Sequence, residues 1–507
     1  MTGVEIGLFV FYGLVLFLLV VFGLHKYFLL FLYWKYKDKP VYKAEEVHNW
    51  PRVTVQLPIY NEKYVIRRLL EAVCAFDYPR VLLEIQVLDD STDETQRVIE
   101  SLVEKYRRQK VDITYIHRTH REGFKAGALA NGMRVAKGEF LAIFDADFVP
   151  QPDFLKKTLG YFKHAEIGMV QTRWGHINRD YSLLTRIQSL FLDGHFVIEH
   201  VARNRSGRFF NFNGTAGIWR KQAILDAGGW QHDTLTEDLD LSYRAQLAGW
   251  KFIYLPDVVS PAELPVEINA YKMQQHRWAK GSIQTAKKLL PVIFKSNFPF
   301  FVKMEASVHL FSNFTYLFMT IPSILMPIIL HVQLHRGWAW MAYLYLFVFF
   351  SSSLSVMIYY LVSQREGGGA WRGQIRYLPF LMSIGIGLSI NNARAVLEAI
   401  FNHVTEFKRT PKYQIEKEGD NWQNKKYRTS LTLQPVVELL LAAYFTVSLV
   451  SLVSEGLLLS IPFFILFQVG FLYIGLLSVF QSKNFAAPMN SMRLFFQRAV
   501  LLVLRRF

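Results

Sequence analysis

The chain has 507 residues, of which 51% are hydrophobic and 42 are phenylalanines, and its formal net charge is +16. This hydrophobic share exceeds that of an ordinary soluble protein, so we expect part of the chain to lie in a membrane. The basic residues are scattered among apolar segments, which argues against nucleic acid as a partner and favours anionic membrane lipids and phosphates. The single cysteine, Cys74, excludes a disulfide framework and a cysteine-rich metal site.

The first predicted element is a membrane-spanning helix near the start of the chain. Val4–Leu24 is almost uninterrupted apolar sequence of the length that crosses a bilayer, and no basic residue precedes it. We therefore interpret residues 1–37 as an uncleaved transmembrane anchor rather than as a signal peptide. Lysines are frequent directly after this run, which predicts that the next segment lies in the cytosol.

Residues 38–262 carry the pattern of a cytosolic α/β domain. Short β-type runs alternate with helical patterns, which is typical of a mainly parallel, Rossmann-like sheet with helices on both faces. The predicted strands are Val53–Leu57, Leu83–Leu88, Ile113–His117, Phe140–Phe144 and Gly168–Gln171. Polar or acidic residues follow each strand, at the sheet edge where ligands bind in such domains.

The rest of the chain is predicted to be helical and associated with the membrane. Residues 263–300 mix apolar and basic side chains in the pattern of amphipathic helices that lie on the inner membrane face. Two spanning hairpins are predicted at 301–363 and 431–482. Their spans are Met304–Val332, Trp338–Val362, Leu431–Val453 and Leu457–Phe480. Residues 483–507 are predicted to form a basic amphipathic tail.

Residues 364–430, between the hairpins, are predicted to contain a re-entrant or interfacial segment and a loop. The apolar run Leu378–Ile390 has the length of a re-entrant segment more often than that of a span. Five spans place both the loop near Phe407 and the basic tail in the cytosol, as the positive-inside tendency prefers. A sixth span would place the tail outside, so we predict a multi-pass protein with about five spans.

Polar turns follow the first two predicted strands. Their candidate nucleotide-binding residues are Pro58, Tyr60, Glu62, Asp89 and Asp90. Carboxylates at such turns can accept hydrogen bonds from a ribose and from a base N–H. An alternative is that Asn61, Ser91 and Asp93 merely cap the helices that follow. Capping does not explain two adjacent aspartates at a strand end.

The pair Asp145 and Asp147 follows the apolar strand Phe140–Phe144. An extended chain directs residues i and i+2 to the same side, so both carboxylates can hold Mg²⁺ or Mn²⁺ against a diphosphate. Such a pair alone is more often a turn or a cap, but its position after a buried strand favours the metal site. Lys125, in a glycine-bearing turn, could point at a phosphate or at these carboxylates, or it could be a solvated lysine.

Thr236, Glu237 and Asp238 precede a helical pattern, so Thr236 could cap that helix. A transfer that inverts an anomeric carbon needs one carboxylate to take the proton of the attacking hydroxyl. Asp238 is the candidate catalytic base, and Glu237 is the less favoured one. The alternative is that both acidic residues only stabilise the start of a helix.

Gln274, Arg277 and Trp278 lie within one or two turns of the predicted interfacial helix. Arg277 could neutralise the charge that develops on a leaving diphosphate. Trp278 offers a flat apolar face for the C–H groups of a sugar ring. The alternative is an interfacial tryptophan beside an arginine that reaches the lipid head groups.

Together these clusters resemble the processive family 2 glycosyltransferases, which include cellulose, mannan and hyaluronan synthases. The motifs that carry the resemblance are Asp89-Asp90, Asp145-x-Asp147, Thr236-Glu237-Asp238 and Gln274-Gln275-His276-Arg277-Trp278. The sequences of these motifs are most similar to those of the cellulose synthase-like mannan and glucan synthases. The resemblance extends from Arg52 to about Lys288. It implies a GT-A fold, inverting transfer from UDP-glucose or GDP-mannose, Mg²⁺ or Mn²⁺, and a channel that extrudes the growing polysaccharide.

The resemblance also implies roles for individual residues. Asp90 would meet the base, Asp145 and Asp147 the metal and diphosphate, and Asp238 the acceptor hydroxyl. The diphosphate and the acceptor would meet Gln274, Arg277 and Trp278. We also assign Asn213 and Gly214 to acceptor binding.

Residues 407–412, Phe-Lys-Arg-Thr-Pro-Lys, are similar to the gating loop that covers the nucleotide in cellulose synthases. By this resemblance Thr410 and Lys412 would contact the donor. The loop departs from the family pattern at Arg409 and Pro411.

The favoured hypothesis is therefore a membrane polymerase that adds one hexose at a time to a β-linked glucan or (gluco)mannan. A second hypothesis is the transfer of a single sugar to a lipid, either polyprenyl phosphate or ceramide. A third, a transporter or scaffold with an inactive domain, predicts the loss of an essential carboxylate, and each expected carboxylate is present. The residues leave the donor sugar and the linkage open.

Overall fold

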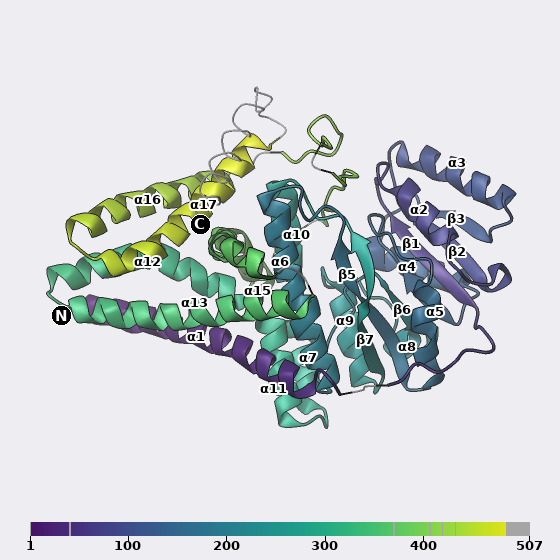
Figure 1. The fold of residues 1–507 in the computed structure, drawn as a ribbon, viewed down its shortest axis with the longest axis horizontal. Helices are drawn as coiled ribbons and strands as arrows, with labels where there is room; N and C mark the ends of the chain where they lie inside the picture. Colours follow the sequence, from purple (N-terminus) through teal and green to yellow (C-terminus); the bar gives the residue numbers. More distant parts are fainter. Residues whose placement is uncertain are drawn as a thin grey trace.

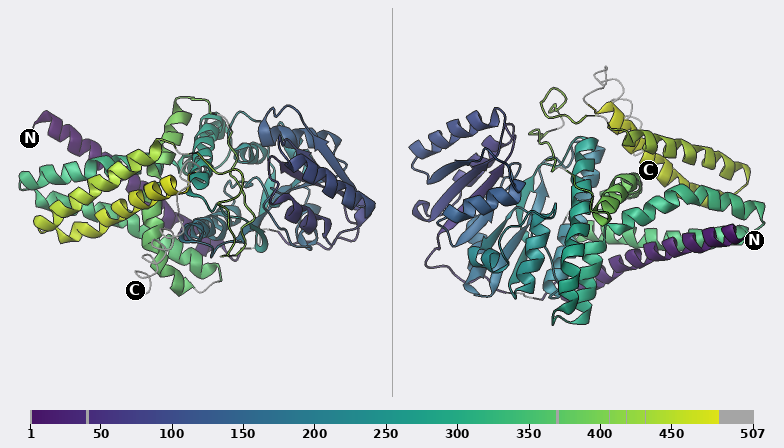
Figure 2. Two further views of the ribbon diagram at one scale, coloured as in Figure 1. Left: turned by 90° about the horizontal axis from the view of Figure 1, so that it is seen from above. Right: turned by 180° about the vertical axis from the view of Figure 1, so that it is seen from behind.

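The computed structural model describes residues 2–39, 42–368, 371–405, 407–417, 419–430 and 432–482. It has two parts, a sheet domain with helices on both faces and a set of long helices that run away from it (Figure 1). Figure 2 shows the same end-to-end arrangement from above and from behind. The predicted basic tail, residues 483–507, lies outside the described residues.

The sheet has seven strands in the order β3-β2-β1-β4-β6-β5-β7. The strands are β1 (Val53–Ile59), β2 (Leu83–Asp89), β3 (Ile113–His117), β4 (Phe140–Ile143), β5 (Ile167–His176), β6 (Gly217–Arg220) and β7 (Lys251–Ala262). β1 pairs in parallel with β2 and β4, and β6 is antiparallel to both of its neighbours. The carboxyl ends of β1, β2 and β4 therefore meet at one edge of the sheet.

All five predicted strands are present, but two further strands escaped the sequence analysis. β6 is only four residues long and too short to show a pattern. β7 contains Pro256 and Pro261, which argue against a central strand. It tolerates them because it is the edge strand of the sheet. β5 also continues five residues past its predicted end, to His176.

Helices cover both faces of the sheet because each presents an apolar stripe to it. On α2, Ile66, Leu69, Leu70 and Val73 recur at helical spacing, and all four are fully buried. The other helices of this domain are α3 (Thr95–Arg108), α4 (Phe124–Val135), α5 (Phe154–Leu159), α6 (Leu183–Asp193), α7 (His200–Arg205), α8 (Lys221–Asp226) and α9 (Glu237–Leu247), with α2 spanning Ile66–Cys74. A π-helical segment, η3 (Gly194–Glu199), joins α6 to α7.

The N-terminal helix α1 (Gly3–Tyr36) is longer than the predicted apolar run. It begins with a capping box, in which Thr2 and Glu5 each accept a hydrogen bond from the backbone N–H of the other. Beyond the apolar run, Leu29, Leu30 and Leu32 are buried in the core shared with the sheet domain. The anchor is thus also part of the packing of the sheet domain.

The C-terminal half is a series of helices. They are α10 (Ile268–Lys295), α11 (Phe300–Phe311), α12 (Phe314–His335), α13 (Ala339–Glu366), α14 (Leu378–Gly387), α15 (Ser389–Ile400), α16 (Gln434–Ser454) and α17 (Ile461–Phe480). α10 crosses the junction of the two parts (Figure 1). The first hairpin span was predicted to begin at Met304, but the chain breaks between α11 and α12, so the long apolar helix begins at Phe314.

Among the described residues, five helices are long and apolar enough to cross a membrane. They are α1, α12, α13, α16 and a helix that includes α17. The segment that contains Leu378–Ile390 forms two helices that meet at an angle of 41°, as a broken span or a re-entrant loop would.

Candidate active site

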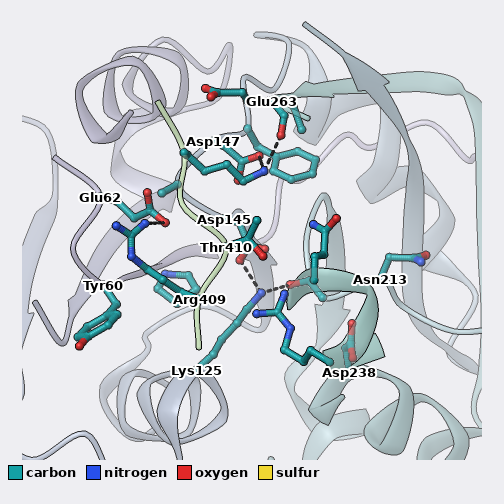
Figure 3. A pocket seen from close by; sticks show the side chains of 18 of the residues that line it. Tyr60, Glu62, Lys125, Asp145, Asp147, Asn213, Asp238, Glu263, Arg409 and Thr410 are labelled. Atoms are coloured by element: carbon teal, nitrogen blue, oxygen red, sulfur yellow. Dashed lines mark hydrogen bonds and ion pairs between the residues drawn. The ribbon is translucent and has the colours of Figure 1, made fainter. Parts of the chain in front are cut away.

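One pocket gathers the predicted site residues at the carboxyl ends of β1, β2 and β4, facing α10 and residues 407–412 (Figure 3). Every one of them except Asp89 lines it. They are Pro58, Tyr60, Glu62, Asp90, Lys125, Asp145, Asp147, Asn213, Gly214, Glu237, Asp238, Gln274, Arg277, Trp278, Thr410 and Lys412. Segments more than 350 positions apart in the chain thus meet in one cavity.

Asp89 lies outside this pocket, which corrects its assignment to nucleotide binding. It is the last residue of β2, and its side chain is fully buried. Its carboxylate accepts hydrogen bonds from the Ser91 N–H at 3.0 Å and from the Tyr115 hydroxyl at 2.8 Å. Neighbouring side chains of an extended chain point to opposite sides, so only one of the two aspartates can face the ligand. Asp89 holds the turn that presents Asp90.

Two arginines that the sequence analysis did not single out complete this side of the pocket. Arg118 donates to both carboxylate oxygens of Asp90, at 2.7 Å and 2.5 Å. The guanidinium of Arg121, which lines the pocket, lies 3.5 Å from the centre of the Tyr60 ring. The sequence signal that could have identified these two arginines is the high density of basic residues just before Lys125.

Asn61 joins the two polar turns instead of capping a helix. Its backbone N–H donates to Ser91 Oγ at 2.8 Å, and its Oδ1 accepts from the Thr92 N–H at 2.8 Å. The N-cap position of α2 is Val65, which makes no side-chain capping bond. The capping alternative is therefore wrong for Asn61. Asp93 does accept from the N–H of Thr95, the first residue of α3, at 2.9 Å.

Lys125 points at the carboxylates rather than into solvent. Its ammonium donates to Asp145 and, at 2.9 Å, to the carbonyl of Gly214. Burial alone would lower the pKa of Lys125, but the carboxylates of Asp145 and Glu237 raise it above its ordinary value. Gly214 has a φ of +81°, a conformation in which a side chain would be strained.

Asp147 pairs with a different lysine, Lys412. The Lys412 ammonium lies 2.7 Å from Asp147 Oδ2 and also donates to the carbonyl of Glu263. The Glu263 side chain accepts from the backbone N–H of Tyr413 at 2.8 Å, so it fixes the chain on which Lys412 lies. Glu263 lines the pocket and was not predicted.

Asp145 and Asp147 suit a divalent cation by their chemistry. Carboxylate oxygens are the ligands that Mg²⁺ and Mn²⁺ prefer, and two of them leave positions for phosphate oxygens. Among the described residues, no group of three or more acidic, histidine or cysteine side chains could hold a metal. An ion held by this pair would fill its other positions with water or with oxygens of a substrate.

Asp238 lies in the first turn of α9, is partly buried and lines the pocket. A Cβ atom on Gly214 would be 2.9 Å from Asp238 Oδ2, so the glycine allows this close approach. Burial, followed by repulsion from Glu237, raises the pKa of Asp238 to about 7, against the attraction of the Lys125 ammonium. A carboxylate with such a pKa can accept a proton near neutral pH.

Thr236 occupies the N-cap position of α9 but makes no side-chain capping bond, which corrects that prediction. It faces α10, where its hydroxyl lies 3.5 Å from Thr285 Oγ1. A Cβ on Gly281 of α10 would lie 2.5 Å from Thr236 Oγ1 and 2.8 Å from its backbone nitrogen. The contact of α9 with α10, and so the position of Asp238, depends on a glycine at 281.

α10 directs one face at the pocket. Arg277 and Trp278 follow Gln274 by three and four residues, which places both beside it on a helix. All three line the cavity. His276 points elsewhere, with its Nε2 3.2 Å from Glu398 of α15. Trp278 therefore faces the pocket, which disfavours a purely lipid-facing role.

Residues 407–412 lie across the side of the pocket that contains Glu62 and Asp147. The ring of Phe407 stacks on Phe124 at 5.2 Å between centres, and the Arg277 guanidinium lies 4.9 Å from the Phe407 ring centre. Arg409 pairs with Glu62 at 2.8 Å, so the position that departs from the family pattern contacts a predicted site residue. Burial raises the pKa of Glu62 to about 7, opposed by Arg409.

Trp174 and His176 line the pocket only because β5 is longer than predicted. The Trp174 ring packs against Phe148 at 5.3 Å and Phe196 at 5.1 Å. Neither residue was assigned a role from the sequence.

Residues 51–281 match the family model described as glycosyltransferase like family 2. This part of the chain is similar to the family 2 glycosyltransferases. The chain is 43% identical over 278 residues to the Arabidopsis thaliana protein named glucomannan 4-beta-mannosyltransferase 2, a match that covers 52% of this chain and 52% of that one. The chain thus spans about half the length of this curated relative. The predicted resemblance to the cellulose synthase-like proteins is confirmed.

A similar solved structure is that of the mannosyltransferase PcManGT from Pyrobaculum calidifontis in complex with GDP-Man and Mn²⁺. The TM-score is 0.52 at 20% sequence identity, and the match covers 78% of this chain and 100% of that chain. At this identity the likeness shows the fold alone. It confirms the prediction of a GT-A, Rossmann-like domain.

Proposed function

We propose that this protein is a membrane-embedded, processive, inverting β-glycosyltransferase that extends a β-1,4-linked mannan or glucomannan from GDP-mannose. The observation that carries the proposal is the convergence of Asp145, Asp147, Asp238, Arg277 and Trp278 in one pocket. The name of the Arabidopsis relative favours mannose over glucose as the transferred sugar.

The chemical step is a displacement at the anomeric carbon of the donor sugar. Asp238 takes the proton from the acceptor hydroxyl, and that oxygen forms the new bond to the anomeric carbon. The bond from this carbon to the diphosphate breaks on the opposite face, which inverts the configuration. The pKa of Asp238, about 7, suits this proton transfer at neutral pH.

Cations on α4, α10 and residues 407–412 receive the leaving diphosphate. Arg277 lies on the pocket face of α10 and is always charged, so it can stabilise the charge that builds up as the bond breaks. Asp145 and Asp147 would hold Mg²⁺ or Mn²⁺, which would neutralise the diphosphate when bound. Lys125 and Lys412, which pair with these carboxylates, are then free to contact phosphate oxygens.

The acceptor sugar is placed against Trp278, with Asn213 and Gly214 beside it. An indole face suits the C–H groups of a neutral sugar ring and does not fix one hydroxyl pattern. This surface favours a chain that slides by one residue after each transfer, over a single lipid-linked acceptor.

The contacts of residues 407–430 support a five-span topology with the glycosyltransferase domain in the cytosol. Arg68 pairs with Glu416 at 2.7 Å and Lys426 with Glu94 at 2.9 Å, so Glu416 and Lys426 lie on the sheet domain. If α12 and α13 cross the membrane and return, the bent pair α14 and α15 must start and end on the cytosolic side. The segment is then re-entrant or interfacial.

Product analysis with purified protein tests the proposal. The protein in lipid nanodiscs is given labelled GDP-mannose or UDP-glucose, Mn²⁺ and β-1,4-mannohexaose. We expect GDP-mannose to yield long products that a β-1,4-mannanase degrades. Products one sugar longer than the acceptor would contradict processivity, and incorporation from UDP-glucose alone would contradict the donor. Transfer only to added polyprenyl phosphate or ceramide would establish the alternative function.

A further inference from the structure

Asn213, at the acceptor side of the pocket, is held by two histidines, of which His200 is fully buried and His195 is partly exposed. His200 Nε2 lies 2.5 Å from Asn213 Oδ1, and His195 Nε2 lies 2.9 Å from Asn213 Nδ2. The backbone N–H of Asn213 donates to Gln171 Oε1 at 2.9 Å. The Asn213 carboxamide is thus bound at both its oxygen and its nitrogen.

One carboxylate, that of Glu199, determines which atoms of this hydrogen-bond series donate and which accept. Glu199 Oε2 lies 3.1 Å from His195 Nδ1, and an ionised carboxylate can only accept. His195 therefore carries its proton on Nδ1, and in the neutral ring Nε2 must accept from the Asn213 amide nitrogen. The amide oxygen then faces His200, which donates through Nε2. The opposite amide orientation would place two acceptors, or two donors, against each other.

His200 is consistent with this assignment. It is fully buried, and burial holds its pKa well below its usual range, so the ring is neutral. A neutral histidine that donates from Nε2 has a bare Nδ1, and His200 Nδ1 has no hydrogen-bond partner within the described chain. The hydrogen bonds therefore assign the proton of His195 to Nδ1 and the proton of His200 to Nε2.

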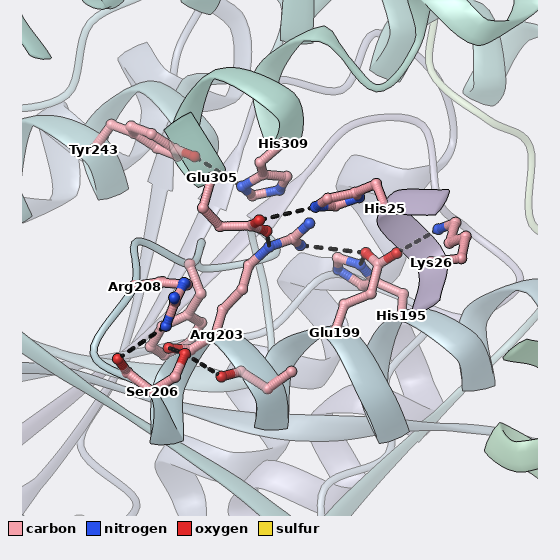
Figure 4. A network of polar contacts seen from close by, with 12 residues as sticks. His25, Lys26, His195, Glu199, Arg203, Ser206, Arg208, Tyr243, Glu305 and His309 are labelled. Atoms are coloured by element: carbon pink, nitrogen blue, oxygen red, sulfur yellow. Dashed lines mark hydrogen bonds and ion pairs between the residues drawn. The ribbon is translucent and has the colours of Figure 1, made fainter. Parts of the chain in front are cut away.

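Glu199 is fixed by a buried network that includes the membrane anchor (Figure 4). Lys26 of α1 lies 2.7 Å from Glu199 Oε1, and Arg203 lies 3.3 Å from Oε2. Arg203 also pairs with Glu305 of α11 at 3.0 Å. Attraction from Lys26 and Arg203 outweighs burial and keeps the pKa of Glu199 well below its usual range, so Glu199 remains an acceptor.

We propose that His195 and His200 are positioning residues of the acceptor site, which fix the Asn213 carboxamide in one orientation that is set by the Glu199–Lys26 ion pair. The fixed amide keeps one N–H and one oxygen lone pair for a hydroxyl of the acceptor sugar. The inference rests on the proposed function, since it assumes that a glycan binds beside Asn213. It assigns neither histidine a contact with the reacting atoms.

The experiment compares His195→Phe, His200→Phe and Asn213→Ala in nanodiscs. Each is tested for the KM of mannohexaose and of GDP-mannose and for the equilibrium Kd of mannohexaose without donor. Loss of one or two hydrogen bonds predicts an acceptor KM and Kd that rise about tenfold, with the donor KM unchanged. In the Asn213→Ala background, His195→Phe is expected to add nothing further, because both changes remove the same contact.

His309→Phe is the matched control, because His309 belongs to the same buried region but bonds Tyr243, at 2.8 Å, instead of Asn213. Its acceptor KM is expected to equal that of the wild type. Asn213→Asp is isosteric and keeps the packing, so it serves if the phenylalanine variants do not fold. It should also raise the acceptor KM, because a carboxylate has no N–H for His195.

Additive effects of His195→Phe and Asn213→Ala, or an unchanged acceptor KM, would overturn the inference. So would equal changes in the donor and acceptor KM, which indicate a general loss of structure. Wild-type protein that neither elongates nor binds mannohexaose would refute the proposed function itself, and the acceptor site with it.

Discussion

The halves of the pocket that we propose for the donor and for the acceptor are built from different chemistry. On the donor side, Asp90, Asp145 and Asp147 each pair with a cationic side chain, from Arg118, Lys125 and Lys412 respectively. On the acceptor side, the Asn213 amide is held by two histidines. The donor side rests on the sheet and residues 407–412, whereas the acceptor side is connected to α1.

The difference follows from what each half has to bind. A nucleotide diphosphate and its metal bring charges that must replace the existing ion pairs, so the donor half is made of partners that can exchange. A neutral sugar chain brings only hydroxyl groups and C–H faces, so the acceptor half needs fixed hydrogen-bonding groups. Asp238 lies between the two halves, and its pKa is affected by the charges of the first.

Asp238→Asn is the largest expected disruption, because it removes the group that joins the halves. An amide cannot take the acceptor proton, so we expect kcat to fall by about 100-fold or more. The Kd of GDP and that of mannohexaose should stay near the wild-type values, since both halves remain. Full turnover in this variant would exclude Asp238 as the base.

Gly281→Ala tests whether the halves must be held at one spacing. The new Cβ would meet Thr236 at 2.5 Å, and forcing α9 from α10 should lower the free energy of unfolding by about 1–3 kcal/mol. Transfer should fall more than GDP binding, because Asp238 moves with α9. Thermal unfolding and kcat are measured together.

Gly7→Ala is the matched helix-glycine control for Gly281→Ala. A Cβ on Gly7 would have no atom within 4 Å, so its stability and activity should not fall. If Gly281→Ala behaved like Gly7→Ala, the close contact of α9 and α10 would not determine the position of Asp238.

Lys412→Met tests whether the donor half is an exchangeable set of ion pairs. Removing the ammonium leaves Asp147 without its cation, so nucleotide-free binding of Mn²⁺ should tighten, on the order of tenfold. Donor binding should weaken at the same time, because a phosphate contact is lost. Electron paramagnetic resonance of free Mn²⁺ gives the metal affinity without any activity assay.

Lys426→Met is the control for charge alone. Lys426 and Glu94 are about half exposed, at 52% and 54%, and a pair of this kind contributes little. The Mn²⁺ affinity of the Lys426→Met variant should match that of the wild type. Equal tightening in both variants would mean that the net charge, and not the Lys412–Asp147 pair, controls metal binding.

The sequence placed residues of both halves in the pocket, but it did not identify several of the side chains that hold them. Asp145, Asp147, Asp238 and Arg277 follow strands or lie at helical spacing, so local patterns place them in the pocket. Asp89 was misplaced because adjacent residues look alike in sequence although only one can face the ligand. The carboxyl end of a strand indicates a position but not a side-chain direction.

Other parts of the site depend on tertiary structure and have no local signal. His195 and His200 lie in a π-helical turn and the helix after it, and their bonds to Asn213 appear only when β5, α7 and α9 are packed together. β7 was missed because its prolines suit an edge strand, and edge position is a property of the sheet. Glu263, which follows that strand, was missed with it.

The smallest expected effect is a shift of the pH profile in Glu237→Gln. Asp238 acts as a base only when it is ionised, so activity should fall as the pH drops below its pKa, about 7. Glu237 raises this pKa by repulsion, and a neutral glutamine removes that contribution. The acid limb of kcat/KM should therefore move to lower pH, by up to about one unit. An acid limb that stays in place or moves to higher pH would show that the pKa of Asp238 does not respond to the charges of the donor half. The two halves would then be electrostatically independent.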